Sequence, residues 1–145
     1  MNTFHRILIA TDFSPASEPA VLQGLALARE TRSDVWIAHA YTPPGAAESE
    51  FVAPGEYARW EGNIRREIEK KLEPILANAK KLGVTARPLV VSGNPGEVIP
   101  EAAKEYGADL LVMGTHGRTG VSRMLLGSVA SRVISTAPCP VLTVH

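Results

Sequence analysis

The sequence contains five short apolar runs, and the segments between them have the spacing of helices. The runs cover residues 7–10, 35–41, 89–91, 110–113 and 141–144. They are nearly continuous rather than alternating, which is typical of β-strands covered on both faces. Strand–helix–strand alternation at these lengths implies right-handed crossovers. The pattern therefore predicts an α/β fold: a single domain over residues 1–145, with a doubly wound, mostly parallel sheet of five strands and helices on both faces.

Each predicted helix presents an apolar stripe. The stripe of the first helix consists of Val21, Leu22, Leu25, Ala26 and Ala28. This helix can start at Ser14 or at Ser17, and the sequence leaves both starts open. The second helix begins near residue 57 and ends at Gly83, and Pro74 inside it is expected to produce a kink. The third helix covers residues 95–106.

Composition limits the partners and the compartment. Fifteen basic and fifteen acidic side chains cancel, so no net field attracts nucleic acid or an anionic membrane. The single cysteine, Cys139, excludes an internal disulfide and suits a reducing compartment. No apolar run has the length of a signal-peptide core or of a membrane span. We therefore expect a cytoplasmic protein without nucleic-acid or membrane partners. Residues 42–55, with three prolines, are expected to form a surface loop or lid.

Two common phosphate-binding motifs do not occur in the sequence. There is no P-loop of the form G-x4-G-K-[ST], and no G-x-G-x-x-G follows the first apolar run. That run leads instead into Thr11 and Asp12, followed by Phe-Ser-Pro. Asp12 either contacts a ligand or only caps the first helix.

A glycine pattern follows the fourth apolar run. Gly114, Gly117, Gly127 and Ser128 have the spacing G-x2-G-x9-G-[ST]. Glycines behind a buried strand let the backbone approach a ligand closely and adopt positive φ. Gly127 and Ser128 also open the fourth predicted helix, which stops before Pro138, and a helix N-terminus is a seat for phosphate. The pattern indicates a nucleotide site; the competing interpretation is that these glycines only form turns and close packing.

These motifs resemble those of a known family. Residues 9–14 (IATDFS), residues 107–114 (GADLLVMG), the glycine pattern and residues 138–144 (PCPVLTV) are similar to universal stress proteins of the ATP-binding subtype. The resemblance spans residues 7–144. It implies a Rossmann-like fold of the adenine nucleotide alpha hydrolase type, with strand order 3-2-1-4-5. Strands one and four are then neighbours at a topological switch point, where ligands bind beyond the carboxyl ends of the strands.

The resemblance also implies a set of ATP-binding residues. They are Ala10, Thr11, Asp12, His39, Ala40, Met113, Gly114, Gly117, Arg118, Gly127, Ser128 and Val129. Asp12 is expected to contact the adenosine, and the backbone beside His39 is expected to receive the adenine edge. The phosphates are expected along Gly117, Gly127, Ser128 and Val129, with Arg118, and less strongly Arg123, as counter-charges. Mg²⁺ would arrive with the nucleotide rather than occupy a site of its own.

Two histidines invite a catalytic role that the sequence does not support. His116 has no nucleophile or orienting acid close in the chain, so a loop position is favoured over that of a general base. His39 is expected to line the wall of the site. We therefore expect a nucleotide-dependent sensor or switch in the stress response, at most a weak ATPase. The alternative is a nucleotide-independent interaction or chaperone-like module on the same fold.

The last apolar run, Val141–Val144, is outermost on its side of the sheet in this strand order. It carries no charge before His145. An uncovered apolar edge is a template for strand pairing. Together with the family resemblance, this predicts a homodimer joined through the C-terminal strand.

Overall fold

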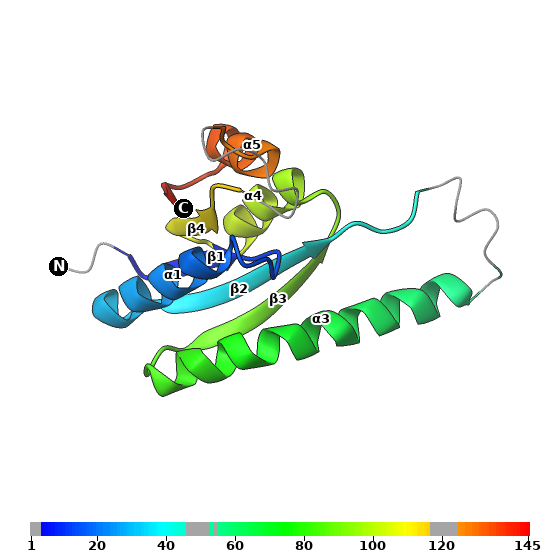
Figure 1. The fold of residues 1–145 in the computed structure, drawn as a ribbon, viewed down its shortest axis with the longest axis horizontal. Helices are drawn as coiled ribbons and strands as arrows, with labels where there is room; N and C mark the ends of the chain where they lie inside the picture. Colours follow the sequence, from blue (N-terminus) through cyan, green and yellow to red (C-terminus); the bar gives the residue numbers. More distant parts are fainter. Residues whose placement is uncertain (1–3, 46–52, 54, 117–124) are drawn as a thin grey trace.

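Five parallel strands form one sheet in the computed structural model, which describes residues 4–45, 53, 55–116 and 125–145. The strands are β1 (Arg6–Ala10), β2 (Asp34–Tyr41), β3 (Ala86–Ser92), β4 (Leu110–Gly114) and β5 (Val141–Val144). Their order is β3-β2-β1-β4-β5, with every pair parallel (Figure 1). The predicted strand order and parallel pairing are therefore confirmed, and β1 and β4 are neighbours.

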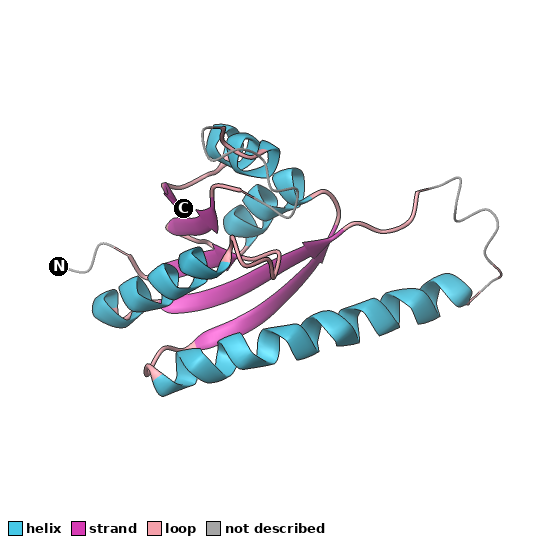
Figure 2. Ribbon diagram, viewed as in Figure 1, coloured by secondary structure: helices cyan, strands magenta, loops and turns pink. Residues whose placement is uncertain are grey.

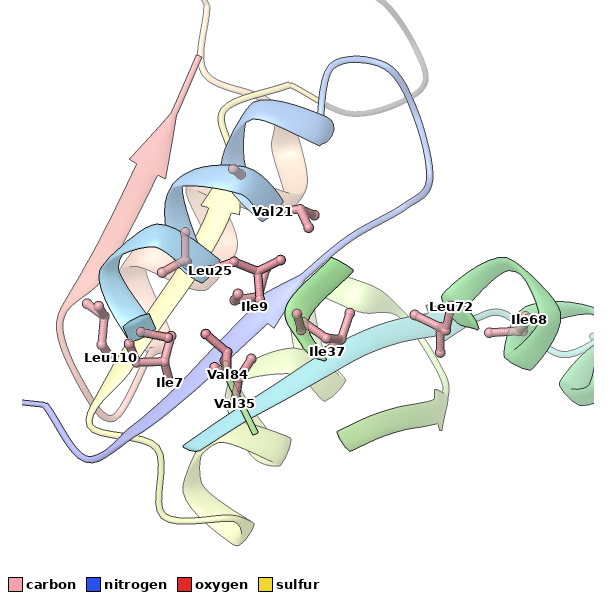
Figure 3. Packing of buried hydrophobic residues seen from close by; sticks show 14 of the residues in the cluster. Ile7, Ile9, Val21, Leu25, Val35, Ile37, Ile68, Leu72, Val84 and Leu110 are labelled. Carbon is pink, nitrogen blue, oxygen red and sulfur yellow. The ribbon is translucent and has the colours of Figure 1, made fainter. Parts of the chain in front are cut away.

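Helices cover both faces of the sheet (Figure 2). They are α1 (Glu18–Thr31), α3 (Glu56–Lys81), α4 (Pro95–Glu105) and α5 (Ser128–Thr136). Because side chains alternate along a strand, Ile7 and Ile9 of β1 pack with α1 and α3, whereas Leu8 packs with α4 and α5. Figure 3 shows the first layer, in which the labelled residues of β1 and β2 lie against those of the two helices.

The first helix begins at the later of the two predicted starts, and its buried face is narrower than the predicted apolar stripe. Ser17 is the N-cap residue, so the start at Ser14 is wrong. Val21, Leu25 and Ala28 are buried, but Leu22 is 52% exposed and Ala26 is exposed. Successive helical residues differ by about 100° around the axis, so a neighbour of a buried position lies at the edge of the stripe.

Helix α3 is the longest element, with 26 residues. Its N-terminal half extends past the carboxyl ends of the strands (Figure 1). Pro74 lies inside the helix, and Gly83 follows it with a φ of 74°. Trp60 is half-buried and lies with its ring 6.2 Å from that of Tyr41. In the predicted loop, residues 46–52 and 54 lie outside the described part of the chain.

Cys139 lies on the face of the sheet that α4 and α5 cover. Cys139 is half-buried against the α4 and α5 layer, and burial, followed by the nearby Asp109 carboxylate, raises the pKa of its thiol. A raised thiol pKa lowers the thiolate fraction, and the side chain packs here as a small apolar group. Within the described ranges, no helix has the length and hydrophobicity needed to cross a lipid bilayer.

Candidate functional site

A cavity of about 520 Å³ lies at the carboxyl ends of β1, β2 and β4. This is the point at which the strand order reverses, where open α/β sheets bind ligands. The predicted site residues that the structure describes all line it: Ala10, Thr11, Asp12, His39, Ala40, Met113, Gly114, Gly127, Ser128 and Val129. The remaining predicted residues, Gly117, Arg118 and Arg123, lie outside the described residues. The fold thus brings together residues that are more than one hundred positions apart in the chain.

The turn between β1 and α1 holds Asp12 at the cavity. Its Oδ1 accepts hydrogen bonds from the backbone N–H of Ser14, at 2.9 Å, and from the Ser14 hydroxyl. This is an Asx turn. The alternative that Asp12 caps the first helix is wrong, because Ser17 occupies the N-cap position. The carboxylate is half-buried and lines the cavity wall.

Phe13 has an unusual backbone conformation, with a φ of 64°. The left-handed region is strained for a residue with a side chain, at roughly 1 kcal/mol or more. The backbone N–H of Phe13 donates to the Thr11 hydroxyl at 3.1 Å. The Phe13 ring stacks on the imidazole of His39, with 4.4 Å between centroids. On α3, the Lys71 ammonium lies 5.6 Å from the centroid of the Phe13 ring.

His39 is buried, with 8% of its surface exposed. Its Nδ1 lies 2.8 Å from the carbonyl oxygen of Thr11. A carbonyl only accepts hydrogen bonds, so Nδ1 carries the hydrogen. The bond holds the ring against the turn that contains Asp12. His39 therefore lines the cavity wall, as the sequence predicts.

A polar network ties α3 to the end of β2. The Tyr41 hydroxyl donates to Glu61 at 2.6 Å and accepts from Arg65 Nε at 3.1 Å. Arg65 also donates to the carbonyl of Val90 on β3, at 3.4 Å. Burial, and then the hydrogen bond to Glu61, raise the pKa of Tyr41. Sequence reasoning missed this tyrosine, since it reads as one more apolar residue at the end of a strand.

Close approach of the backbone accounts for Gly114. A Cβ at this position would lie 3.3 Å from the carbonyl oxygen of Ala16 and 3.5 Å from Cα of Ser17. Gly127 has a φ of −60° and a ψ of 154°. Neither glycine lies in the left-handed region, so the expectation of positive φ is wrong for these two. At Gly114 a glycine is needed because the neighbouring backbone leaves too little space for a side chain.

The N-terminus of α5 is open toward the cavity. Gly127 donates its N–H to the carbonyl of Thr115 at 2.7 Å. No described side chain caps the first turn of α5, whereas the Asn94 side chain accepts from Gly96 at the start of α4. The first N–H groups of a helix have no partner within the helix, and Ser128 and Val129 line the cavity. This end of the cavity suits an anion.

The cavity also has walls that the sequence analysis did not assign to the site. Ile64, Ile68 and Lys71 of α3 line it, as do Pro95 and Ile99 of α4. The α3 residues are spaced by four and three positions, and so lie on one helical face. That spacing was visible in the sequence, but it predicts only a buried stripe. No group of three or more His, Cys, Asp or Glu residues in the described ranges could hold a metal ion.

Known proteins share this architecture. The model of the universal stress protein family matches residues 3–145. Universal stress protein MJ0531 of Methanocaldococcus jannaschii is 36% identical over 146 residues, covering 99% of this chain and 83% of the relative. The solved structure of MJ0577, from the same organism, has a TM-score of 0.84 at 30% identity and covers 97% of this chain and 94% of that one.

A third relative carries a ligand. A universal stress protein solved in complex with cAMP has a TM-score of 0.73 at 28% identity, with 98% of this chain and 97% of that chain covered. The family model and these relatives extend over nearly the whole chain, and the sheet order is the one that the sequence motifs imply. This chain belongs to the universal stress protein family.

Proposed function

We propose that this protein binds ATP in the cavity at the ends of β1 and β4 and acts as a nucleotide-dependent switch in the stress response. The observation that carries the proposal is that one cavity contains both the Asp12 carboxylate and the N-terminus of α5, which no described side chain caps. The two ends suit the two ends of a nucleotide. The cAMP complex of a relative at 28% identity supports an adenine nucleotide as the ligand class.

The chemistry of the cavity divides between its two ends. The N–H groups of Ser128 and Val129 at the start of α5 would donate to phosphate oxygens, with the Ser128 hydroxyl as a further donor. Asp12 would accept from ribose hydroxyls. The backbone near Ala40, a residue that lines the cavity, would receive the adenine edge. Mg²⁺ commonly keeps several waters and binds through the phosphates, so it would arrive with the nucleotide.

We expect slow hydrolysis at most. A general base must have an acceptor atom within reach of the attacking water. Both ring nitrogens of His116 already contact protein atoms, namely the Thr115 hydroxyl and the carbonyl of Leu125. Retention of ATP with little turnover is the behaviour of a switch rather than of an enzyme.

The homodimer is part of the same proposal. β5 is the last strand of the described sheet and pairs only with β4 there. All four of its residues remain partly exposed. An apolar strand edge of this kind pairs readily with its own copy about a two-fold axis. Leu125 and Leu126, 62% and 45% exposed, add apolar surface near the start of α5.

The decisive experiment first identifies the bound ligand and then disrupts the binding site by a substitution. Mass spectrometry of the protein purified without added nucleotide should release ATP. Gly127→Val should abolish ATP binding in calorimetry while the circular dichroism spectrum stays native, because the side chain fills the approach to the α5 N-terminus. Gly45→Val is the control, since a Cβ there meets nothing within 4 Å. A native parent that neither carries nor binds ATP would favour the nucleotide-independent module instead.

A further inference from the structure

The imidazole of His116 joins two stretches of chain that flank the cavity. Its Nδ1 lies 2.9 Å from the hydroxyl oxygen of Thr115. Its Nε2 contacts the carbonyl oxygen of Leu125, nine residues further along and two residues before Gly127. The ring is half-buried and lines the cavity. It therefore connects the end of β4 with the residues that lead into α5.

The two contacts define which nitrogen carries the hydrogen. A carbonyl oxygen can only accept, so Nε2 donates to Leu125. In the neutral imidazole, Nδ1 is then the acceptor, and the Thr115 hydroxyl donates to it. The Leu125 carbonyl thus selects the tautomer, and the Thr115 hydroxyl, which can donate or accept, donates to Nδ1 in response. Such second hydrogen bonds are the usual way in which a histidine is oriented.

Two backbone hydrogen bonds hold Thr115 in place. Its N–H donates to the carbonyl of Val144 on β5 at 3.1 Å, which continues the pairing of β4 with β5. Its own carbonyl accepts from Gly127 at 2.7 Å. The approach to α5 is therefore held at two points, by the backbone at Gly127 and by the imidazole at Leu125.

We propose that His116 is a positioning residue for the phosphates: its Nε2–H bond to Leu125 holds the approach to α5 so that the N–H groups of Ser128 and Val129 face the cavity before a nucleotide arrives. The inference rests on the proposed function and gives one of its residues a role. A donor that is already in place loses no further conformational entropy when the ligand binds. A side chain so engaged acts through the helix N-terminus and not as a base.

The test uses three substitutions that differ in where they place an amide. In His116→Gln the amide nitrogen can reach the position of Nε2, whereas in His116→Asn it corresponds to Nδ1. His116→Ala removes both. Binding of ATP and of adenosine is measured by calorimetry for the parent and each variant. Because adenosine has no phosphates, its affinity reports the rest of the cavity and whether the variant is folded.

We expect ATP affinity to fall about fivefold in His116→Ala and His116→Asn, the worth of one net hydrogen bond, and to stay within about twofold of the parent in His116→Gln. Adenosine affinity should be the same in all four proteins. Equal ATP affinity in the parent and His116→Ala would overturn the role of His116 and leave the proposed function standing. So would a parallel loss of ATP and adenosine, or rescue by Asn rather than Gln. A parent that binds neither ligand would overturn both.

A second readout does not depend on any ligand. Long-range ¹H–¹⁵N correlation spectra of the nucleotide-free protein report which ring nitrogen of His116 is protonated. We expect the Nε2–H tautomer in the parent and also in Thr115→Val, because the Leu125 carbonyl that accepts from Nε2 is unchanged there. An Nδ1–H tautomer in the parent would overturn the contact with Leu125 and with it the proposal.

Discussion

Gly24 in α1 gives a sharp prediction, because two effects of similar size oppose each other there. A Cβ on Gly24 would lie 2.6 Å from Cδ1 and 2.8 Å from Cγ1 of Ile9, and 3.5 Å from Cγ1 of Val112. Replacing a helical glycine by alanine normally stabilises a helix by about 1 kcal/mol. Overpacking a core costs about 1 to 3 kcal/mol. Ile9 is fully buried, so its side chain cannot swing away, and the cost should win.

We therefore expect Gly24→Ala to lower the free energy of unfolding by up to about 2 kcal/mol. Gly62 in α3 is the matched control. A Cβ there would meet only the Arg66 guanidinium, at 4.0 Å, so Gly62→Ala should raise the free energy of unfolding by about 0.5 to 1 kcal/mol. Urea denaturation followed by circular dichroism measures both. The midpoint temperatures should move in opposite directions, by about 3 °C per kcal/mol for a chain of this length.

A double variant tests whether the clash is the cause. Ile9→Val removes Cδ1, the atom closest to the new Cβ, and by itself should cost about 1 kcal/mol. In the Gly24→Ala background the same change should cost little, giving a favourable coupling of about 1 kcal/mol. If Gly24→Ala stabilises the protein as much as Gly62→Ala does, the reasoning from close contact is refuted.

Three further predictions concern the site and its surroundings. Tyr41→Phe should cost about 1 to 2 kcal/mol at neutral pH, because Glu61 and Arg65 lose the hydroxyl. The pKa of Tyr41 is raised from 10.0, so the stability that its hydroxyl contributes is complete below pH 10.0 and is lost as the pH rises through the raised pKa. Urea denaturation should show the free energies of unfolding of the parent and Tyr41→Phe converging in that range. A difference between them that does not change with pH would contradict this. Phosphate release at saturating ATP should be slow, and its rate should fall less than tenfold in His116→Ala, since a general base contributes about a hundredfold or more to the rate. A larger drop would identify His116 as a general base. Light scattering should show a dimer that Leu142→Asp or Val144→Lys dissociates. A parent that is monomeric at micromolar concentration would exclude the dimer, and a dimer that survives both changes would place the interface elsewhere.

The sequence alone determined the architecture, because apolar patterns report burial directly. Near-continuous apolar runs separated by helical stripes are compatible with few arrangements other than a two-sided parallel sheet. The glycine pattern and Asp12, with the strand order that the family resemblance implies, then indicated the switch point between β1 and β4, where the cavity lies. These features are local in the chain, or follow from which strands are neighbours, so one sequence suffices to predict them.

Only the tertiary structure decided what each side chain touches. The contacts of Tyr41 with Arg65, of Phe13 with Lys71 and of His116 with Leu125 depend on where the α3 helix and the start of α5 pass. Nothing in the spacing of a tyrosine or a lysine specifies such distant partners. Exposure of Leu22 was hidden for a related reason, since a residue at the edge of a helical stripe is buried only if a neighbouring element reaches it. Composition and period specify which faces are covered, but close packing decides which atoms meet.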